Sequence, residues 1–218
     1  MLKLYYGNTQ LIQSPGVFEE LMNKMNEQRR SKVLRCKNEK DQKSSLLAGF
    51  LLRYALEQEG LNYDRLCFGI TPEKKPVLLS EPKLYFSLSH SGDYAVCLIS
   101  DQEIGVDIEN TRRPIMADRQ SLRLDHVASK SFTDGEYQQY MGLPEKEKRE
   151  FFLRAWTRKE SYSKAVGRGL AEGFATIDTE KKEFWSCWLA EDYYLSVYCE
   201  NPKLFENDLI MKEVCDVR

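Results

Sequence analysis

Several features that mark common classes of protein are missing from this sequence. It contains only two histidines, and its six cysteines are scattered singly with no Cys-x-x-Cys pair. Neither a zinc site nor a disulfide framework is therefore indicated. No uncharged apolar segment approaches the ~18 residues that a membrane-spanning helix needs, and the N-terminus has no long apolar run after a basic stretch. We expect a cytoplasmic protein that does not associate with membranes.

The sequence also lacks an excess of charge of either sign. The formal net charge is −2, which provides no overall positive field and predicts no nucleic-acid partner. An anionic ligand must therefore meet a local group of cations. Apolar residues make up 42% of the chain and charged residues 30%, which is typical of a globular protein. The length of 218 residues allows one large domain or two small lobes.

The spacing of apolar residues predicts helices first, then strands, and then a helix and further strands. The expected elements are helices at residues 14–35, 41–58, 133–141 and 144–167, and strands at residues 85–89, 94–100, 104–109, 174–178, 184–189 and 193–199. Residues 111–126 carry little regular signal. This order predicts an α+β fold made of two lobes.

Two acidic residues share one face of the strand expected at 104–109. Its aliphatic residues alternate with Gly105, Asp107 and Glu109, so the strand would bury its aliphatic side and project both carboxylates from the other. Neighbouring carboxylates repel each other unless a cation lies between them. Carboxylates without Cys or His select a hard ion, of which magnesium is the expected one. The alternative is an acidic edge strand whose carboxylates face water, and this segment by itself does not decide between the two.

A second charged segment lies inside the long helix expected at 144–167. Glu160 and Lys164 are four residues apart, so they share a face of that helix. A carboxylate beside lysines suits a site that binds a metal and phosphate oxygens together. The alternative is a solvated ion pair worth only ~0.3–0.5 kcal/mol. Lys159 is expected to be solvated, and the Gly-Arg-Gly sequence at 167–169 ends the helix.

Three segments have residue types, order and spacing in common with one enzyme family. They are Phe86-Ser87-Leu88-Ser89-His90-Ser91, Gly105-Val106-Asp107-Ile108-Glu109, and the run from Trp156 to Lys164 followed by Gly167 to Leu170. Together they resemble the signature motifs of the 4′-phosphopantetheinyl transferases, specifically the longer, monomeric, Sfp-like type. The resemblance implies two similar α+β lobes in a pseudo-two-fold arrangement. Residues 1–106 would bind coenzyme A, residues 107–218 would carry the metal and the catalytic helix, and the active site would lie between the lobes.

The same resemblance implies a reaction. Such enzymes use Mg²⁺ to transfer the 4′-phosphopantetheine group from coenzyme A to a serine of an apo acyl- or peptidyl-carrier protein, and they release 3′,5′-ADP. A metal that bridges both phosphates would neutralise the charge that builds on the leaving oxygen. Two alternatives stay open: a magnesium-dependent hydrolase of coenzyme A or another nucleotide diphosphate, and a non-catalytic coenzyme A binding module.

The resemblance also implies roles for individual residues. The expected metal ligands are Asp107, Glu109 and Glu160, the expected catalytic residues are Glu160 (the best candidate general base), Lys164 and His90, and coenzyme A is expected to contact Lys43, Lys75, Pro76, Ser89, His90 and Lys164.

Two positions depart from the family pattern. Lys74 replaces the glycine of a Gly-Lys-Pro element that Lys75 and Pro76 otherwise match. Ser44 stands where the family commonly has an arginine that serves the 3′-phosphate. A nearby cation must compensate, and Lys43 is the first choice, ahead of Lys40 and Arg35, because it is adjacent.

Residues 112–130 combine basic and apolar side chains just after the acidic strand. Their cations are Arg112, Arg113, Arg119, Arg123 and Lys130. A basic loop with apolar residues at this position is expected to dock an acidic helix of the carrier protein. The alternative is an ordinary solvated face.

Overall fold

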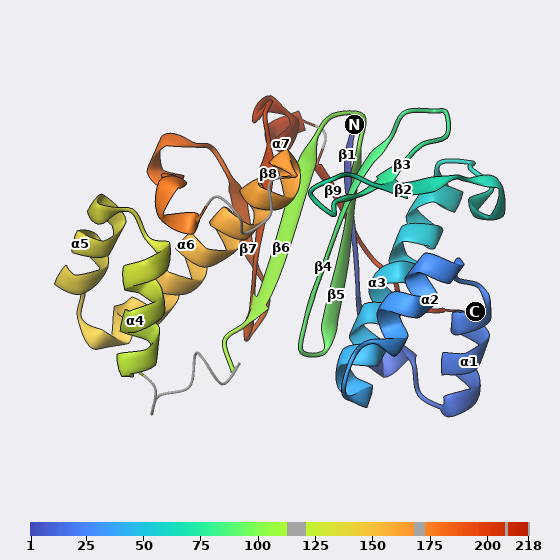
Figure 1. Ribbon diagram of the computed structural model, residues 1–218, viewed down its shortest axis with the longest axis horizontal. Helices are drawn as coiled ribbons and strands as arrows, with labels where there is room; N and C mark the ends of the chain where they lie inside the picture. The colour runs from blue at the N-terminus through green and yellow to red at the C-terminus, as the bar shows by residue number, and fades with distance from the viewer. Residues whose placement is uncertain (113–120, 168–172, 208, 218) are drawn as a thin grey trace.

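The computed structural model describes residues 1–112, 121–167, 173–207 and 209–217. Within these residues a four-stranded and a three-stranded sheet lie between two groups of helices (Figure 1). A two-stranded hairpin of β2 (Phe68–Ile70) and β3 (Pro76–Leu78) lies beside them. The expected α+β fold is confirmed.

The bounds of the elements follow the chain. The helices are α1 (Pro15–Asn23), α2 (Glu27–Leu34), α3 (Glu39–Gln58), α4 (Ser121–Ser131), α5 (Asp134–Gly142), α6 (Glu145–Val166) and α7 (Lys203–Asn207). The strands are β1 (Leu2–Asn8), β2 (Phe68–Ile70), β3 (Pro76–Leu78), β4 (Tyr85–Ser91), β5 (Tyr94–Ser100), β6 (Ile104–Asn110), β7 (Trp185–Ala190), β8 (Tyr193–Cys199) and β9 (Leu209–Glu213).

The four-stranded sheet has the order β4-β5-β1-β9. β1 pairs antiparallel with β5 and parallel with β9, so the strands nearest the two ends of the chain lie side by side. α3 packs on one face of this sheet, and α1 and α2 pack against α3 (Figure 1). The core between them contains the apolar side of α3 together with Tyr5, Phe86 and Cys97 from the strands.

The three-stranded sheet has the order β6-β8-β7 and is antiparallel. One face packs against the four-stranded sheet, where Leu4 and Val96 meet Val106 and Val197 in a buried cluster. The other face is covered by α6 (Figure 1). Because side chains alternate along a strand, burial of the aliphatic residues of β6 between the sheets turns Gly105, Asp107 and Glu109 to the other side, as the sequence predicts.

The expected helices and strands are confirmed with two exceptions. The helix predicted at 14–35 is two helices, because the chain turns between them and the Asn26 side chain caps α2 by accepting from the Arg29 N–H at 2.8 Å. The strand predicted at 174–178 is wrong. A short 3-10 helix (Phe174–Thr176) forms there, and the carbonyls of Phe174 and Ile177 accept hydrogen bonds from the buried Lys159 ammonium instead of from a strand.

Among the described residues, six α-helices and strands form where no element was predicted: β1, β2, β3, β9, α4 and α7. The expected boundary between residues 106 and 107 falls inside β6, and β9 joins the sheet that contains β1. The division into two lobes at that boundary stays a prediction. No helix in the described ranges is both long and apolar enough to span a bilayer.

Gly105 allows α6 to cross β6 in direct backbone contact. A Cβ atom at this position would lie 1.8 Å from the Ser161 carbonyl oxygen and 2.7 Å from the Ala165 nitrogen. Neither backbone atom can move without displacing the helix. The approach therefore fixes α6, with Glu160 and Lys164, against the acidic strand.

Gly105→Ala should destabilise the fold strongly. Overpacking a core typically costs about 1–3 kcal/mol, and a clash with helix backbone belongs at or above the upper end. Urea titration measures this loss as the difference in the free energy of unfolding between Gly105→Ala and the wild type. Gly135→Ala is the matched control, because a Cβ at Gly135 meets nothing within 4 Å. A Gly105→Ala protein as stable as this control would contradict the direct contact.

Candidate active site

A row of serines joins β4 to the edge of β6. Ser87, Ser89 and Ser91 alternate along β4 and are buried. Their hydroxyl oxygens accept hydrogen bonds from three successive outward N–H groups of β6, those of Val106 at 3.0 Å, Ile108 at 3.3 Å and Asn110 at 3.0 Å. An edge strand leaves such groups unpaired. Here side chains of the other sheet satisfy them.

Two of these serines also hold the acidic residues of β6. Ser89 Oγ donates to Asp107 Oδ1 at 2.8 Å, and Ser91 Oγ donates to Glu109 Oε2 at 2.8 Å. Asp107 is 4% exposed and Glu109 7% exposed. Both carboxylates are therefore buried between the sheets and α6, and the alternative of an acidic edge strand facing water is excluded.

Lys164 of α6 contacts both Asp107 and Ser89. Its Nζ lies 2.6 Å from Asp107 Oδ1 and donates to Ser89 Oγ at 3.0 Å. The other oxygen, Asp107 Oδ2, is buried and has no hydrogen-bond partner among the described residues. A buried, unpaired carboxylate oxygen is unfavourable unless a donor or a cation meets it. This atom therefore marks a place that a ligand can fill.

The three predicted metal ligands come from two elements. Asp107 and Glu109 lie side by side on β6, and Glu160 lies one turn before Lys164 on the same side of α6. Within the described ranges, no three His, Cys, Asp or Glu side chains are grouped closely enough to be recognised as a metal site. The all-oxygen donors and the unpartnered Asp107 Oδ2 nevertheless fit a hard cation such as Mg²⁺. The ligand set stays a prediction.

His90 faces away from the serine row, toward α3. Its Nδ1 lies 3.3 Å from Ser44 Oγ. Burial, followed by the positive charges of Arg29, Lys32 and Lys164, lowers the pKa of His90 to about 4. The imidazole is therefore neutral at physiological pH and stands among cations.

Arg29 is the most enclosed of these cations. Its side chain crosses α3 at Gly49, where a Cβ would lie 2.6 Å from Arg29 Nε. The guanidinium donates to the Ser45 carbonyl, while Nε is buried and has no hydrogen-bond partner among the described residues. Burial lowers the pKa of Arg29 to about 10, and no described carboxylate forms an ion pair with it.

Lys32 completes the group. Its pKa is lowered to about 8 by loss of hydration and by the charges of Arg29 and Lys164, and in the described part of the chain no carboxylate pairs with it. Lys32 is exposed, but cations that lie close together repel one another unless an anion lies between them. Arg29, Lys32 and Lys164 beside His90, called here the cation cluster, therefore suit a ligand with several negative charges, such as a phosphate or diphosphate.

The Lys75–Pro76 segment contacts the C-terminal end of α6. Lys75 Nζ donates to the Ala165 carbonyl at 2.5 Å, and Gly167 would bring a Cβ within 3.3 Å of the Lys75 side chain. Pro76 begins β3. Lys74 has φ +68, the left-handed conformation that glycine adopts most readily. The backbone thus keeps the form of a Gly-Lys-Pro element although the glycine is replaced.

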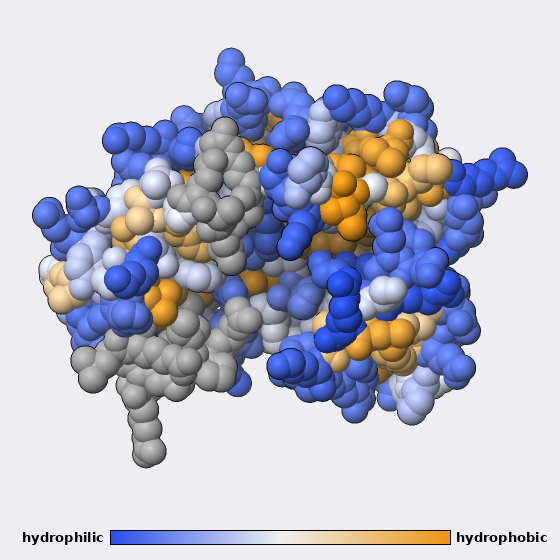
Figure 2. Space-filling view, in the orientation of Figure 1, coloured by the Kyte–Doolittle hydropathy of each residue, from blue (hydrophilic) through white to orange (hydrophobic). Residues whose placement is uncertain are grey.

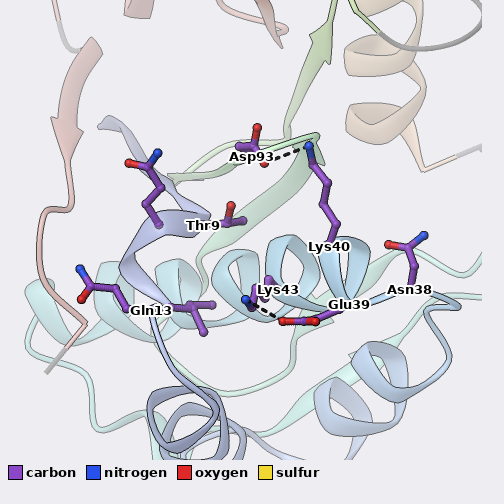
Figure 3. A pocket seen from close by; sticks show the side chains of 9 residues that line it. Thr9, Gln13, Asn38, Glu39, Lys40, Lys43 and Asp93 are labelled. Carbon is purple, nitrogen blue, oxygen red and sulfur yellow. Dashed lines mark ion pairs between the residues drawn. The ribbon is translucent and has the colours of Figure 1, made fainter.

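Lys43 lies on a different side of α3 from Ser44. It pairs with Glu39 at 2.8 Å and lines a pocket with Thr9, Gln13 and Lys40 (Figure 3). Lys40 pairs with Asp93 at 3.0 Å across the same pocket. The structure places Arg29, rather than Lys43, with His90.

Two further sequence expectations have clear outcomes in space. Lys159 is 0% exposed and pairs with Glu136 at 2.6 Å, so the expectation that it is solvated is wrong. In the predicted docking segment 112–130, residues 113–120 lie outside the described ranges. Arg112 lies at its start and pairs with Asp192.

Comparisons with known proteins agree with the motifs. Residues 103–209 match a model described as 4′-phosphopantetheinyl transferase superfamily, and residues 13–103 match one described as 4′-phosphopantetheinyl transferase, N-terminal. The two matches meet at residue 103 and leave only the ends of the chain uncovered. The chain belongs to the 4′-phosphopantetheinyl transferase superfamily.

Individual relatives of this superfamily member are bacterial and animal proteins. The chain is 29% identical over 154 residues to 4′-phosphopantetheinyl transferase Sfp of Bacillus subtilis strain 168, which is 70% of this chain and 65% of the relative. It is 28% identical to psf-1 of Bacillus pumilus, over 66% of this chain and 58% of the relative. The chain is also 33% identical to 4′-phosphopantetheinyl transferase HetI of a Nostoc species, over 59% of this chain and 49% of the relative. The chain thus spans about three fifths of the length of these Bacillus relatives.

His90 should make the folding stability of this superfamily member depend on pH. Its pKa of about 4 lies below the usual 6.5, so the unfolded state binds the proton more tightly. The stabilisation is complete above pH 6.5 and is lost as pH falls toward 4, by up to about 1.4 kcal/mol per pH unit. His90→Gln should remove this part of the slope in urea unfolding between pH 4 and 7.5. His126→Gln shows the effect of losing an exposed histidine, and equal slopes in wild type and His90→Gln would contradict burial of a neutral imidazole.

Proposed function

We propose that this protein transfers the 4′-phosphopantetheine group of coenzyme A to a serine of an apo acyl- or peptidyl-carrier protein, with Mg²⁺, and releases 3′,5′-ADP. One observation carries the proposal: Lys164, which pairs with the buried Asp107, belongs to the same cluster as Arg29 and Lys32, two cations that no described carboxylate pairs with. A cation site and an anion site thus adjoin. Mg²⁺ together with a diphosphate needs both.

The reaction exchanges one bond to phosphorus for another. The carrier serine oxygen attacks the phosphorus nearer the pantetheine, and the bond from that phosphorus to the bridging oxygen breaks, so that 3′,5′-ADP leaves with the electron pair. Asp107, Glu109 and Glu160 would hold the metal, which when bound neutralises charge on the diphosphate. Glu160 is proposed to accept the serine proton. Lys164 is proposed to donate to a phosphate oxygen from its place beside Asp107.

Arg29 is proposed to take the place of the family arginine that Ser44 replaces. Ser44 and His90 are in contact, and the Arg29 guanidinium binds the carbonyl of the next residue, Ser45. The Arg29 charge therefore lies next to position 44, but it arrives from α2. Lys43, which faces the other pocket, remains the second choice for this contact.

The remaining partners follow the same proposal. The carrier protein is proposed to dock on residues 112–130. The protein is proposed to act as a monomer in the cytoplasm, with residues 1–106 binding coenzyme A and residues 107–218 carrying the metal. Lys75, Pro76 and Ser89 are proposed to line the coenzyme A site.

Transfer itself is the first test. The protein is incubated with coenzyme A, Mg²⁺ and several apo-carrier proteins, and mass spectrometry shows whether the carrier gains the phosphopantetheine arm. Asp107→Asn should lower kcat/KM about 100-fold or more, because a metal ligand and the partner of Lys164 are lost together. Asp101→Asn, which alters an exposed carboxylate on a neighbouring turn, should leave it unchanged, and a chelator should abolish transfer.

The two alternatives give different results in the same assay. A hydrolase would consume coenzyme A with water as fast as with carrier. A binding module would bind coenzyme A without regard to Mg²⁺ and would keep its affinity after Glu160→Ala. Either result, with no carrier modified, would remove the proposed reaction.

The role of Arg29 has a test of its own. Arg29→Gln should raise the KM for coenzyme A about tenfold or more, because a charge-assisted contact to phosphate is lost, and should change the KM for dephospho-coenzyme A much less. Arg30→Gln alters the exposed neighbouring arginine and is the matched control. An equal rise for both substrates would show that Arg29 does not serve the 3′-phosphate.

A further inference from the structure

Ser89 and Ser91 make the same pair of hydrogen bonds one layer apart. Each hydroxyl accepts from a β6 N–H group and donates to the carboxylate of the residue just before that N–H. The pairs are Ile108 N (3.3 Å) with Asp107 Oδ1 (2.8 Å) for Ser89, and Asn110 N (3.0 Å) with Glu109 Oε2 (2.8 Å) for Ser91.

The direction of these bonds is fixed by chemistry. A hydroxyl has a single proton to donate. Since a backbone N–H can only donate, each serine oxygen accepts from β6 and its own proton is left for the carboxylate. Ser91 is 3% exposed, so bulk water competes little with this bond. Hydrogen bonds to an ionised acceptor are among the stronger ones.

The two serine hydroxyls restrict the orientation of both carboxylates, together with Lys164 in the case of Asp107. Same-face positions on a strand are ~7 Å apart, and like charges repel. β4, which belongs to the other sheet, supplies one donor to each of these side chains. The geometry of the acidic pair therefore depends on how the two sheets pack.

We propose that Ser91 is a positioning residue for Glu109, and that through it the packing of β4 on β6 sets the affinity of the site for a divalent cation. The inference rests on the proposed function, because it takes Asp107 and Glu109 to be metal ligands. Ser89 acts in the same way on Asp107. It also accepts a hydrogen bond from Lys164, so its replacement would disturb two partners, and Ser91 gives the cleaner test.

Ser87 provides a matched control within the same row. It accepts from the Val106 N–H at 3.0 Å, but the residue before Val106 is Gly105, which has no carboxylate. Ser87→Ala and Ser91→Ala each remove one acceptor of a β6 N–H. Only Ser91→Ala also removes a donor to an acidic side chain.

The experiment measures Mn²⁺ binding by electron paramagnetic resonance on the full chain, alone and with coenzyme A. Ser91→Ala should weaken Mn²⁺ binding about tenfold, the lower end of what loss of an outer hydrogen bond to a metal ligand produces. Ser91→Thr keeps the hydroxyl and should restore most of the affinity. Ser87→Ala should lower the melting temperature about as much as Ser91→Ala does, but should leave Mn²⁺ binding unchanged.

Three results would overturn the inference: Mn²⁺ affinity in Ser91→Ala equal to wild type, an equal loss in Ser87→Ala, or no Mn²⁺ binding by the wild-type protein. Failure of the proposed function looks different. A wild-type protein that binds Mn²⁺ in a Ser91-dependent way but modifies no carrier would retain the positioning role and lose the reaction. A protein that modifies carriers, but whose Mn²⁺ binding does not change in Ser91→Ala, would retain the reaction and lose the positioning role.

Discussion

The hydrogen bonds between the serines of β4 and the edge of β6 are the interaction on which the rest of the structure depends. Two sheets that pack face to face usually leave edge N–H groups to water. In this protein Ser87, Ser89 and Ser91 satisfy three such groups of β6. The edge of one sheet can therefore be buried beside the other, and acidic side chains on that edge are buried with it.

Burial of the edge explains the electrostatics of the site. Asp107 loses hydration and gains Lys164 and Ser89 as partners on one oxygen. Arg29 loses hydration and gains only a backbone carbonyl. Asp107 Oδ2 and Arg29 Nε are both buried without a hydrogen-bond partner among the described residues. A ligand that carries both a hard cation and phosphate oxygens would neutralise the carboxylate and the arginine together. A single ion would neutralise only one of them.

A second buried ion pair holds the helix that carries Glu160. Lys159 pairs with Glu136 and donates to two carbonyls after the helix, while the adjacent Glu160 turns toward the side that carries Lys164. Neighbouring residues of a helix point about 100° apart around its axis, so the two side chains can face different surroundings. Lys159 and Gly105 together fix the rotation of α6. The sequence shows Lys159 and Glu160 side by side in one motif. It does not show that Lys159 is internal while Glu160 lies beside the site.

Local pattern determined much of this protein. Alternation in 104–109 placed Asp107 and Glu109 on one face, the four-residue spacing placed Glu160 with Lys164, and the motif order identified the superfamily. The tertiary structure alone decided that Arg29 and Lys32 join His90. On α2 they look like any basic residues of a solvated helix, and only the crossing at Gly49 buries the Arg29 side chain among other cations. Periodicity reports which residues share a face, because that depends on backbone geometry. Which faces meet depends on packing between segments far apart in the chain, and no local pattern contains it.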